Sequence, residues 1–155
     1  MTKKRLIRSV ARFGVPFVIA SASIVLIYTG SSKLLSPSAF AETIATHGLI
    51  PNDLTPHISW GVIALELTIG VSSLWLLVGK QLTKPAAIGA SVVFAAFAWY
   101  AGAMVVFPPD APTSCGCSGA TDEPANWRAL TGRNSAAAGL LLLTIPVSRR
   151  TTTPH

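Results

Sequence analysis

Residues 57–79, HISWGVIALELTIGVSSLWLLVG, form an apolar stretch that contains a single acidic residue, Glu66. A membrane helix needs about 20 mostly apolar residues to cross the hydrocarbon core, so this stretch predicts a transmembrane helix. Residues 13–34, 85–107 and 130–147 have similar character, although the last stretch is shorter and carries Arg133 near its start. We therefore predict an all-α integral membrane protein whose four spans pack as a four-helix bundle.

The composition supports this class. Of the 155 residues, 50% are hydrophobic and only 12% are charged, whereas about a quarter are charged in soluble proteins. The length predicts one membrane domain over residues 1–155. A formal net charge of +6 could indicate nucleic-acid binding. The basic residues flank apolar segments and form no patch, so the expected partner is the lipid bilayer and not nucleic acid.

The N-terminal segment allows two interpretations. Residues 1–28 have a basic head and an apolar body, as a signal peptide does. The apolar run is long enough to span a bilayer, and no clean small-residue cleavage site follows it. These features favour an uncleaved first helix.

The basic residues predict the orientation in the membrane. With four spans, nine of the 12 lysines and arginines fall on one side: Lys3, Lys4, Arg5, Arg8, Arg12, Lys80, Lys84, Arg149 and Arg150. The positive-inside rule assigns that side to the cytoplasm. We expect a multi-pass protein of the cell inner (cytoplasmic) membrane, with both termini inside (N-in/C-in) and Cys115 and Cys117 outside.

The first outer loop contains the pattern of a short helix, SPSAFAETIATHG at residues 36–48. Ser36 can serve as N-cap, Pro37 suits the first helical position, and Gly48 can end the helix. Phe40 and Ile44 share one face, so the helix is expected to lie in the outer membrane interface.

The two cysteines of the chain lie in PTSCGCSG, residues 112–119. Outside the cytoplasm, thiols meet an oxidising environment. A Cys115–Cys117 disulfide would close a very small ring, whose departure from relaxed geometry makes it easier to reduce. Gly116 tolerates the backbone torsions that this ring requires. Because a structural staple gains its effect by closing a long loop, the spacing favours an exchange-active dithiol, and hence a candidate thiol–disulfide oxidoreductase.

Two alternatives remain for the cysteines. They can be inert thiols or a loop pin of minor consequence. They can also bind a metal together with His47 or His57, although the chain has no second cysteine pair for a closed tetrahedral zinc site.

The cysteine count limits the mechanism. Electron transfer between two dithiols of one chain needs four cysteines, and this chain has two. The pair must therefore exchange with a partner protein on the outer side. Any further step needs a non-thiol acceptor, such as a membrane quinone, or a second protein.

Glu66 is expected to face the interior of the bundle, because an acid at that depth costs about 2.5–3.5 kcal/mol on insertion scales. It shares a helical face with the small residues Ser59, Gly70 and Ser73, as close membrane helix packing requires. Its candidate partners are Lys33 and Arg133, and Asn134 can join that network. The contact can be a structural tie between helices, or it can handle protons below the cysteine loop.

Four segments together resemble the methylamine-utilisation MauE family, part of the wider group of DoxX-like four-helix membrane proteins. They are SSKLLSPSAFAETIATHGLIPNDL (31–54), ALELTIGVSSLWLLVG (64–79), SCGCSG (114–119) and GRNSAAAGLLLL (132–143). The resemblance implies a bundle that supports maturation of a periplasmic enzyme by disulfide formation or transfer, beside a thioredoxin-like partner. The matching positions are Lys33, Pro37, Glu66, Cys115, Cys117, Arg133 and Asn134. Ser118 departs from the aromatic residue expected after the second cysteine.

The first functional hypothesis is therefore thiol–disulfide exchange on the outer face, in support of an extracytoplasmic protein that resembles methylamine dehydrogenase or serves another redox pathway. The second is a non-catalytic membrane subunit or assembly factor that docks another membrane protein. Its small-residue stripes and apolar surface fit both hypotheses.

Overall fold

The computed structural model describes residues 3–79, 83–116 and 123–148 of the chain. These residues form five helices and contain no strand, which confirms the all-α prediction. The helices are α1 (Lys3–Leu34), α2 (Pro37–Thr46), α3 (Thr55–Val78), α4 (Thr83–Val106) and α5 (Trp127–Ser148).

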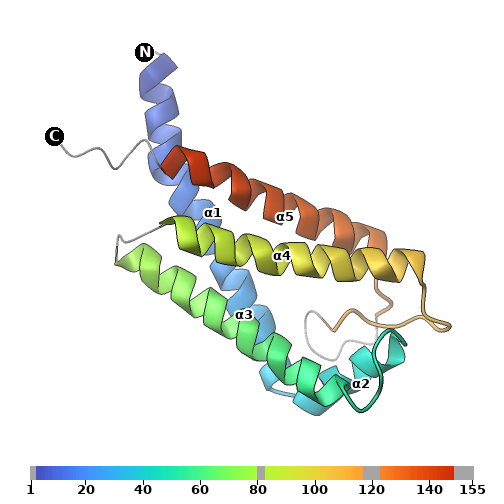
Figure 1. The fold of residues 1–155 in the computed structure, drawn as a ribbon. Coiled ribbons are helices and arrows are strands. Elements are labelled where there is room, and N and C mark those ends of the chain that lie inside the picture. Colours follow the sequence, from blue (N-terminus) through green and yellow to red (C-terminus); the bar gives the residue numbers. More distant parts are fainter. Residues whose placement is uncertain (1–2, 80–82, 117–122, 149–155) are drawn as a thin grey trace.

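The four long helices pack against one another, and the short α2 lies at one end of them (Figure 1). α4 lies along α5, and α1 lies along α3. The start of α1 and the end of α5 lie at the end of the molecule opposite to α2 (Figure 1). The described parts of the loop between α4 and α5, residues 107–116 and 123–126, approach α2. We call residues 107–126 the cysteine loop.

Three helices among the described residues are long and apolar enough to cross a membrane. They comprise Gly14–Leu34, Thr55–Val78 and Lys84–Val106, and they correspond to the first three predicted spans. The fourth predicted span, 130–147, falls within α5, whose first part carries Arg128, Arg133 and Asn134 and is less apolar. The fourth membrane crossing therefore remains a prediction.

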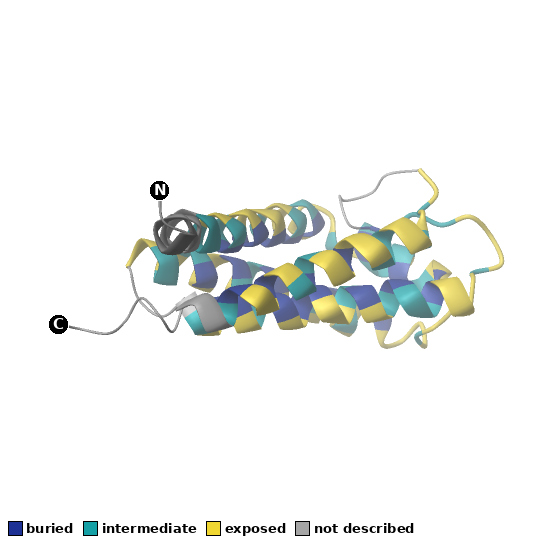
Figure 2. Ribbon diagram, turned by 90° about the horizontal axis from the view of Figure 1, so that it is seen from above, coloured by how far each residue is buried: buried dark blue, intermediate teal, exposed yellow. Residues whose placement is uncertain are grey.

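The main apolar core lies between α1, α4 and α5. Ile19 and Leu26 from α1, Phe94 from α4 and Leu141 from α5 belong to it and are buried. The alanines of α4 allow its neighbours to approach closely. The outward faces of the long helices are exposed (Figure 2) and carry large apolar side chains such as Trp75, at 70% exposure. An apolar outer surface of this kind is what helices in contact with lipid require.

α1 and α3 approach closely at Gly70, which belongs to the predicted small-residue stripe. The buried face of α3 includes Ser59, Glu66, Gly70 and Ser73, which confirms that they share a face. A Cβ atom at Gly70 would lie 3.1 Å from the backbone nitrogen of Ile27 and 2.8 Å from its side chain. The helices can pack at this distance only because the residue is a glycine.

α2 confirms the short helix predicted in the first loop. It begins at Pro37 after Ser36, which makes no side-chain capping hydrogen bond, and it ends before Gly48, whose φ is +70°. The face that carries Phe40 and Ile44 packs against Ile63 of α3. This apolar face is therefore covered by protein, whereas the sequence pattern suggested that it faces the membrane interface.

Candidate functional site: a buried ion pair beneath the cysteine loop

A buried ion pair joins α1 to α3. Nζ of Lys33 donates hydrogen bonds to both carboxylate oxygens of Glu66, at 2.5 and 2.7 Å. Thr29 Oγ1 donates a third to the same carboxylate, at 3.1 Å. The two charged side chains are only 4% and 1% exposed. The predicted contact between Glu66 and Lys33 is thus confirmed, and within the described residues it is the one ion pair.

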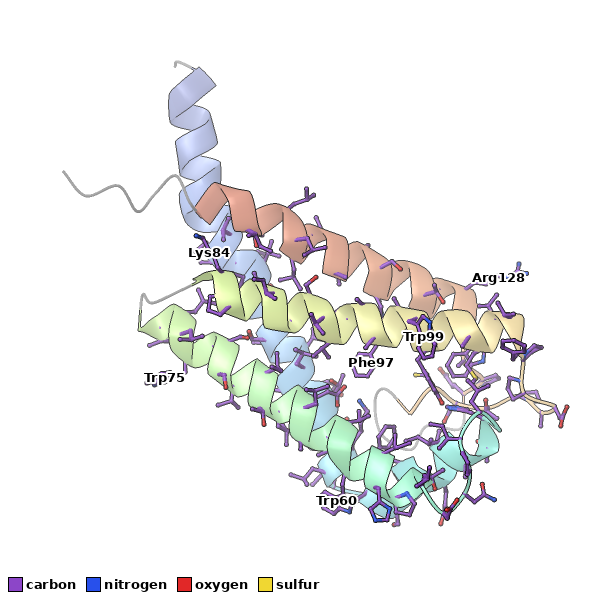
Figure 3. All side chains as sticks on the ribbon, in the orientation of Figure 1. Trp60, Trp75, Lys84, Phe97, Trp99 and Arg128 are labelled. Carbon is purple, nitrogen blue, oxygen red and sulfur yellow. The ribbon has the colours of Figure 1, made fainter. Side chains whose placement is uncertain are left out.

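Two aromatic rings enclose the Lys33 ammonium. Its Nζ lies 5.2 Å from the ring centroid of Phe40 on α2 and 5.4 Å from that of Phe97 on α4. Figure 3 shows Phe97 on the side of α4 that faces α3. A cation over an aromatic face is attracted by the ring quadrupole, most strongly where water is excluded. Lys33 therefore connects α1, α2, α3 and α4 at one point.

Phe40 also supports the cysteine loop. A Cβ atom at Gly116 would lie 2.9 Å from Cδ2 of Phe40, so only a glycine fits against the ring. Gly116 also has φ +62°, a left-handed conformation that costs other L-residues about 1–2 kcal/mol. The glycine between the two cysteines is therefore fixed by its conformation and by its contact with α2. A chain of contacts runs from Glu66 through Lys33 and Phe40 to Gly116.

His47, which follows α2, holds the residue before Cys115. The side chain is 4% exposed. Its Nε2 lies 2.9 Å from the carbonyl oxygen of Ser114, and its Nδ1 lies 2.7 Å from the hydroxyl of Tyr100 on α4. The ring also packs edge-on against Trp127, with 5.1 Å between centroids. Desolvation by burial lowers the pKa of His47 below its ordinary 6.5, although the hydrogen bond with Ser114 opposes this.

Cys115 is half-buried and opens into a pocket of about 260 Å³. The exposed residue Arg133 lines the same pocket from α5. The other lining residues are Glu123, Pro124, Ala125, Asn126, Ala129 and Leu130. The pocket therefore places one basic side chain, Arg133, and one acidic side chain, Glu123, around the opening at Cys115. Cys117 and Ser118 lie outside the described residues.

The remaining predicted site residues lie in different environments, some exposed and some buried. Arg133 is exposed near the cysteine loop and lines the Cys115 pocket, whereas the buried Glu66 carboxylate pairs with Lys33. Asn134, the next residue along α5, is buried. In the metal alternative His47 was a candidate ligand, but both of its ring nitrogens already have hydrogen-bond partners. His57, the other candidate, is exposed on α3.

The sequence reasoning missed the contacts that hold the cysteine loop. It considered His47 only as a metal ligand, and it gave Tyr100 and Phe97 no role. A histidine directly before the helix-ending Gly48 was the available signal, since a polar ring in an otherwise apolar segment needs partners. Nothing in the sequence showed that those partners would be Tyr100 and Ser114.

A family model described as methylamine utilisation protein MauE matches residues 11–146. The matched range includes the Lys33–Glu66 pair, His47 and both cysteines. No curated protein and no solved structure gives a significant match to the chain.

Proposed function

The chain belongs to the MauE family, and from this premise we propose that it is a multi-pass inner-membrane protein that exchanges thiols and disulfides on the outer face through Cys115 and Cys117. Its role would be to support maturation of an extracytoplasmic protein in methylamine utilisation or another redox pathway. The observation that carries the proposal is that the residues on both sides of Cys115 are held from the α2 region. His47, directly after α2, bonds to the Ser114 carbonyl, and Phe40 within α2 packs against Gly116. A reactive cysteine works best when the backbone around it is held in a defined geometry, and these two contacts supply that constraint.

The arrangement of the helices supports a four-helix bundle with both termini in the cytoplasm. The described start of α1 and the described end of α5 lie on the side of the molecule opposite to the cysteine loop (Figure 1). Lys84 is one of the nine basic residues that predict the cytoplasmic side. Arg128 stands next to the cysteine loop, and the two residues lie at opposite ends of the molecule (Figure 3). The loop and its cysteines would then face the oxidising compartment.

In the proposed reaction the cysteine pair exchanges two electrons and two protons with a dithiol of a partner protein. A partner thiolate attacks one sulfur of the Cys115–Cys117 disulfide, the bond between the two cysteines breaks, and a mixed disulfide forms. The second partner thiolate then attacks the mixed disulfide and releases the pair as a dithiol. Two electrons and two protons have moved from the partner to the pair, and the reverse sequence oxidises the partner. A thioredoxin-like fold is the proposed partner class.

A further acceptor must re-oxidise the pair when electrons flow towards this protein. The chain has no third or fourth cysteine, so the acceptor is a membrane quinone or a second protein. Reduction of a quinone to the quinol would take up the same two electrons and two protons.

The test uses the two single cysteine variants. Cys115→Ser and Cys117→Ser should each leave one thiol, and one of them should trap a mixed disulfide with an outer-face protein, seen as a reducible band on a non-reducing gel. The double variant is the matched control and should trap nothing. Two single variants that trap nothing and retain full function would refute exchange, and would favour the non-catalytic docking subunit.

Orientation is tested separately in intact cells. After mild reduction, a membrane-impermeant maleimide should label Cys115 and Cys117 without lysis. Labelling that requires broken membranes would place the cysteines in the cytoplasm and overturn the proposal.

A further inference from the structure

His47 is hydrogen-bonded at both ring nitrogens, and its bonds reach two separate parts of the fold. One partner is the Tyr100 hydroxyl of α4, and the other is the Ser114 carbonyl of the cysteine loop. The ring edge against Trp127 adds a contact with the start of α5. His47 thus ties the end of α2 to α4, α5 and the loop at once.

The chemistry of the partners fixes the tautomer. A backbone carbonyl can only accept a hydrogen bond, so Nε2 must carry the proton and donate to Ser114. In the neutral ring Nδ1 is then an acceptor, and the Tyr100 O–H donates to it. The lowered pKa of His47 keeps the ring neutral near pH 7. Tyr100 therefore orients the ring, and the ring in turn orients the loop.

The hydrogen bond with Ser114 acts directly on Cys115. The Ser114 carbonyl and the Cys115 N–H belong to one planar peptide unit. A hydrogen bond that holds the carbonyl therefore also fixes the orientation of the backbone on the N-terminal side of Cys115. On the other side, Gly116 is fixed against Phe40. The residues on both sides of Cys115 therefore contact the α2 region, Ser114 through His47 and Gly116 through Phe40.

From this geometry we propose that His47, oriented by Tyr100, is a positioning residue that sets the redox equilibrium of the cysteine pair. The inference rests on the proposed exchange function. The oxidised pair needs a backbone that brings two closely spaced sulfurs together, whereas the dithiol does not. Holding the Ser114 peptide plane therefore affects the two redox forms unequally, and a change at His47 alters the equilibrium between them.

The experiment measures that equilibrium in the full-length protein, purified in detergent and incubated with mixtures of reduced and oxidised glutathione. His47→Leu should change the equilibrium constant at least tenfold, about 30 mV for a two-electron couple. His47→Gln should stay within about threefold of wild type, because its amide N–H can still donate to the Ser114 carbonyl. Tyr100→Phe should give a smaller shift in the same direction as His47→Leu. His57→Leu, at an exposed histidine, is the matched control and should change nothing.

The outcomes separate positioning from simple stabilisation. Thermal unfolding is recorded for every variant, and a purely structural role would lower the midpoint without moving the glutathione equilibrium. A folded His47→Leu protein with a wild-type equilibrium overturns the inference, as does His47→Gln behaving like His47→Leu. If His47→Leu does not fold, Tyr100→Phe decides, and the absence of a shift there overturns it. A wild-type pair that does not exchange with glutathione refutes the proposed function, whereas a pair that exchanges regardless of His47 refutes only this inference.

Discussion

Removing one partner of the Lys33–Glu66 pair should destabilise the fold more than removing both. Each side chain is almost fully buried, so a single substitution leaves a charge without its counter-ion. Such a loss costs about 3–5 kcal/mol in other proteins. We expect Lys33→Met and Glu66→Leu each to fall in this range. Glu66→Gln should be milder than Glu66→Leu, because the amide oxygen still accepts hydrogen bonds from Lys33 and Thr29.

The contacts left behind limit these costs. After Glu66→Leu, the Lys33 ammonium keeps the two rings at 5.2 and 5.4 Å, and each desolvated contact is worth up to about 2 kcal/mol. The Thr29 hydroxyl keeps the Val25 carbonyl as an acceptor at 3.0 Å. The double variant Lys33→Met/Glu66→Leu carries no buried charge here. Its free energy of unfolding should therefore lie within about 2 kcal/mol of the wild-type value. If the two single losses were additive, the decrease would instead be roughly 6 kcal/mol or more.

The assay is unfolding in mixed micelles with increasing SDS mole fraction, followed by helical circular dichroism. Lys84→Met, at the start of α4 (Figure 3), is the control and should change stability by no more than about 0.5 kcal/mol. A double variant as unstable as the sum of its single variants would refute the reasoning, since the two groups would then contribute independently.

Three further predictions concern single positions. Gly116→Ala should destabilise the cysteine loop by more than the roughly 1–2 kcal/mol that a left-handed alanine costs, and limited proteolysis of the loop should become faster. Gly48→Ala is the control, because Gly48 has φ +70° and nothing within 4 Å, so it should show the conformational cost alone. Equal effects of the two substitutions would mean that the Phe40 contact is irrelevant. Gly70→Ala should cost about 1–3 kcal/mol by forcing α1 and α3 apart, whereas Gly61→Ala, with nothing within 4 Å, should not destabilise the protein in the same SDS titration; similar values would contradict the close approach. The lowered pKa of His47 means that the unfolded chain binds a proton at this side chain more readily than the folded protein does. The free energy of unfolding should therefore decrease as the pH falls below about 6.5 and level off below the folded-state pKa. Thermal unfolding of His47→Gln should lack this pH dependence, and a pH dependence equal to that of wild type would contradict the prediction.

The sequence was sufficient for features that depend on local pattern. Length and hydropathy located the first three long helices, and helical periodicity placed Glu66 on the face with Ser59, Gly70 and Ser73. The cost of a lone acid in a predicted span then favoured an interior position beside a basic partner. The choice between Lys33 and Arg133 depended on how α1 and α5 are rotated about their axes, which no local pattern records.

Contacts between distant segments were beyond reach for the same reason. His47 bonds to residues 53 and 67 positions away, and Gly116 meets Phe40 across about half of the chain. The face of α2 was recognised as apolar, but whether lipid or α3 covers it depends on the tertiary arrangement. The loop helix was therefore predicted correctly as an element, while its packing was not.

The contact between Gly116 and Phe40 also restricts how the Cys-Gly-Cys sequence can be engineered. In motifs with two residues between the cysteines, those residues are free to vary and adjust the chemistry of the sulfurs. Here a single position separates the cysteines, and packing against α2 reserves it for glycine. Variation in reactivity among proteins built this way must therefore arise outside the motif, in the side chains that surround it.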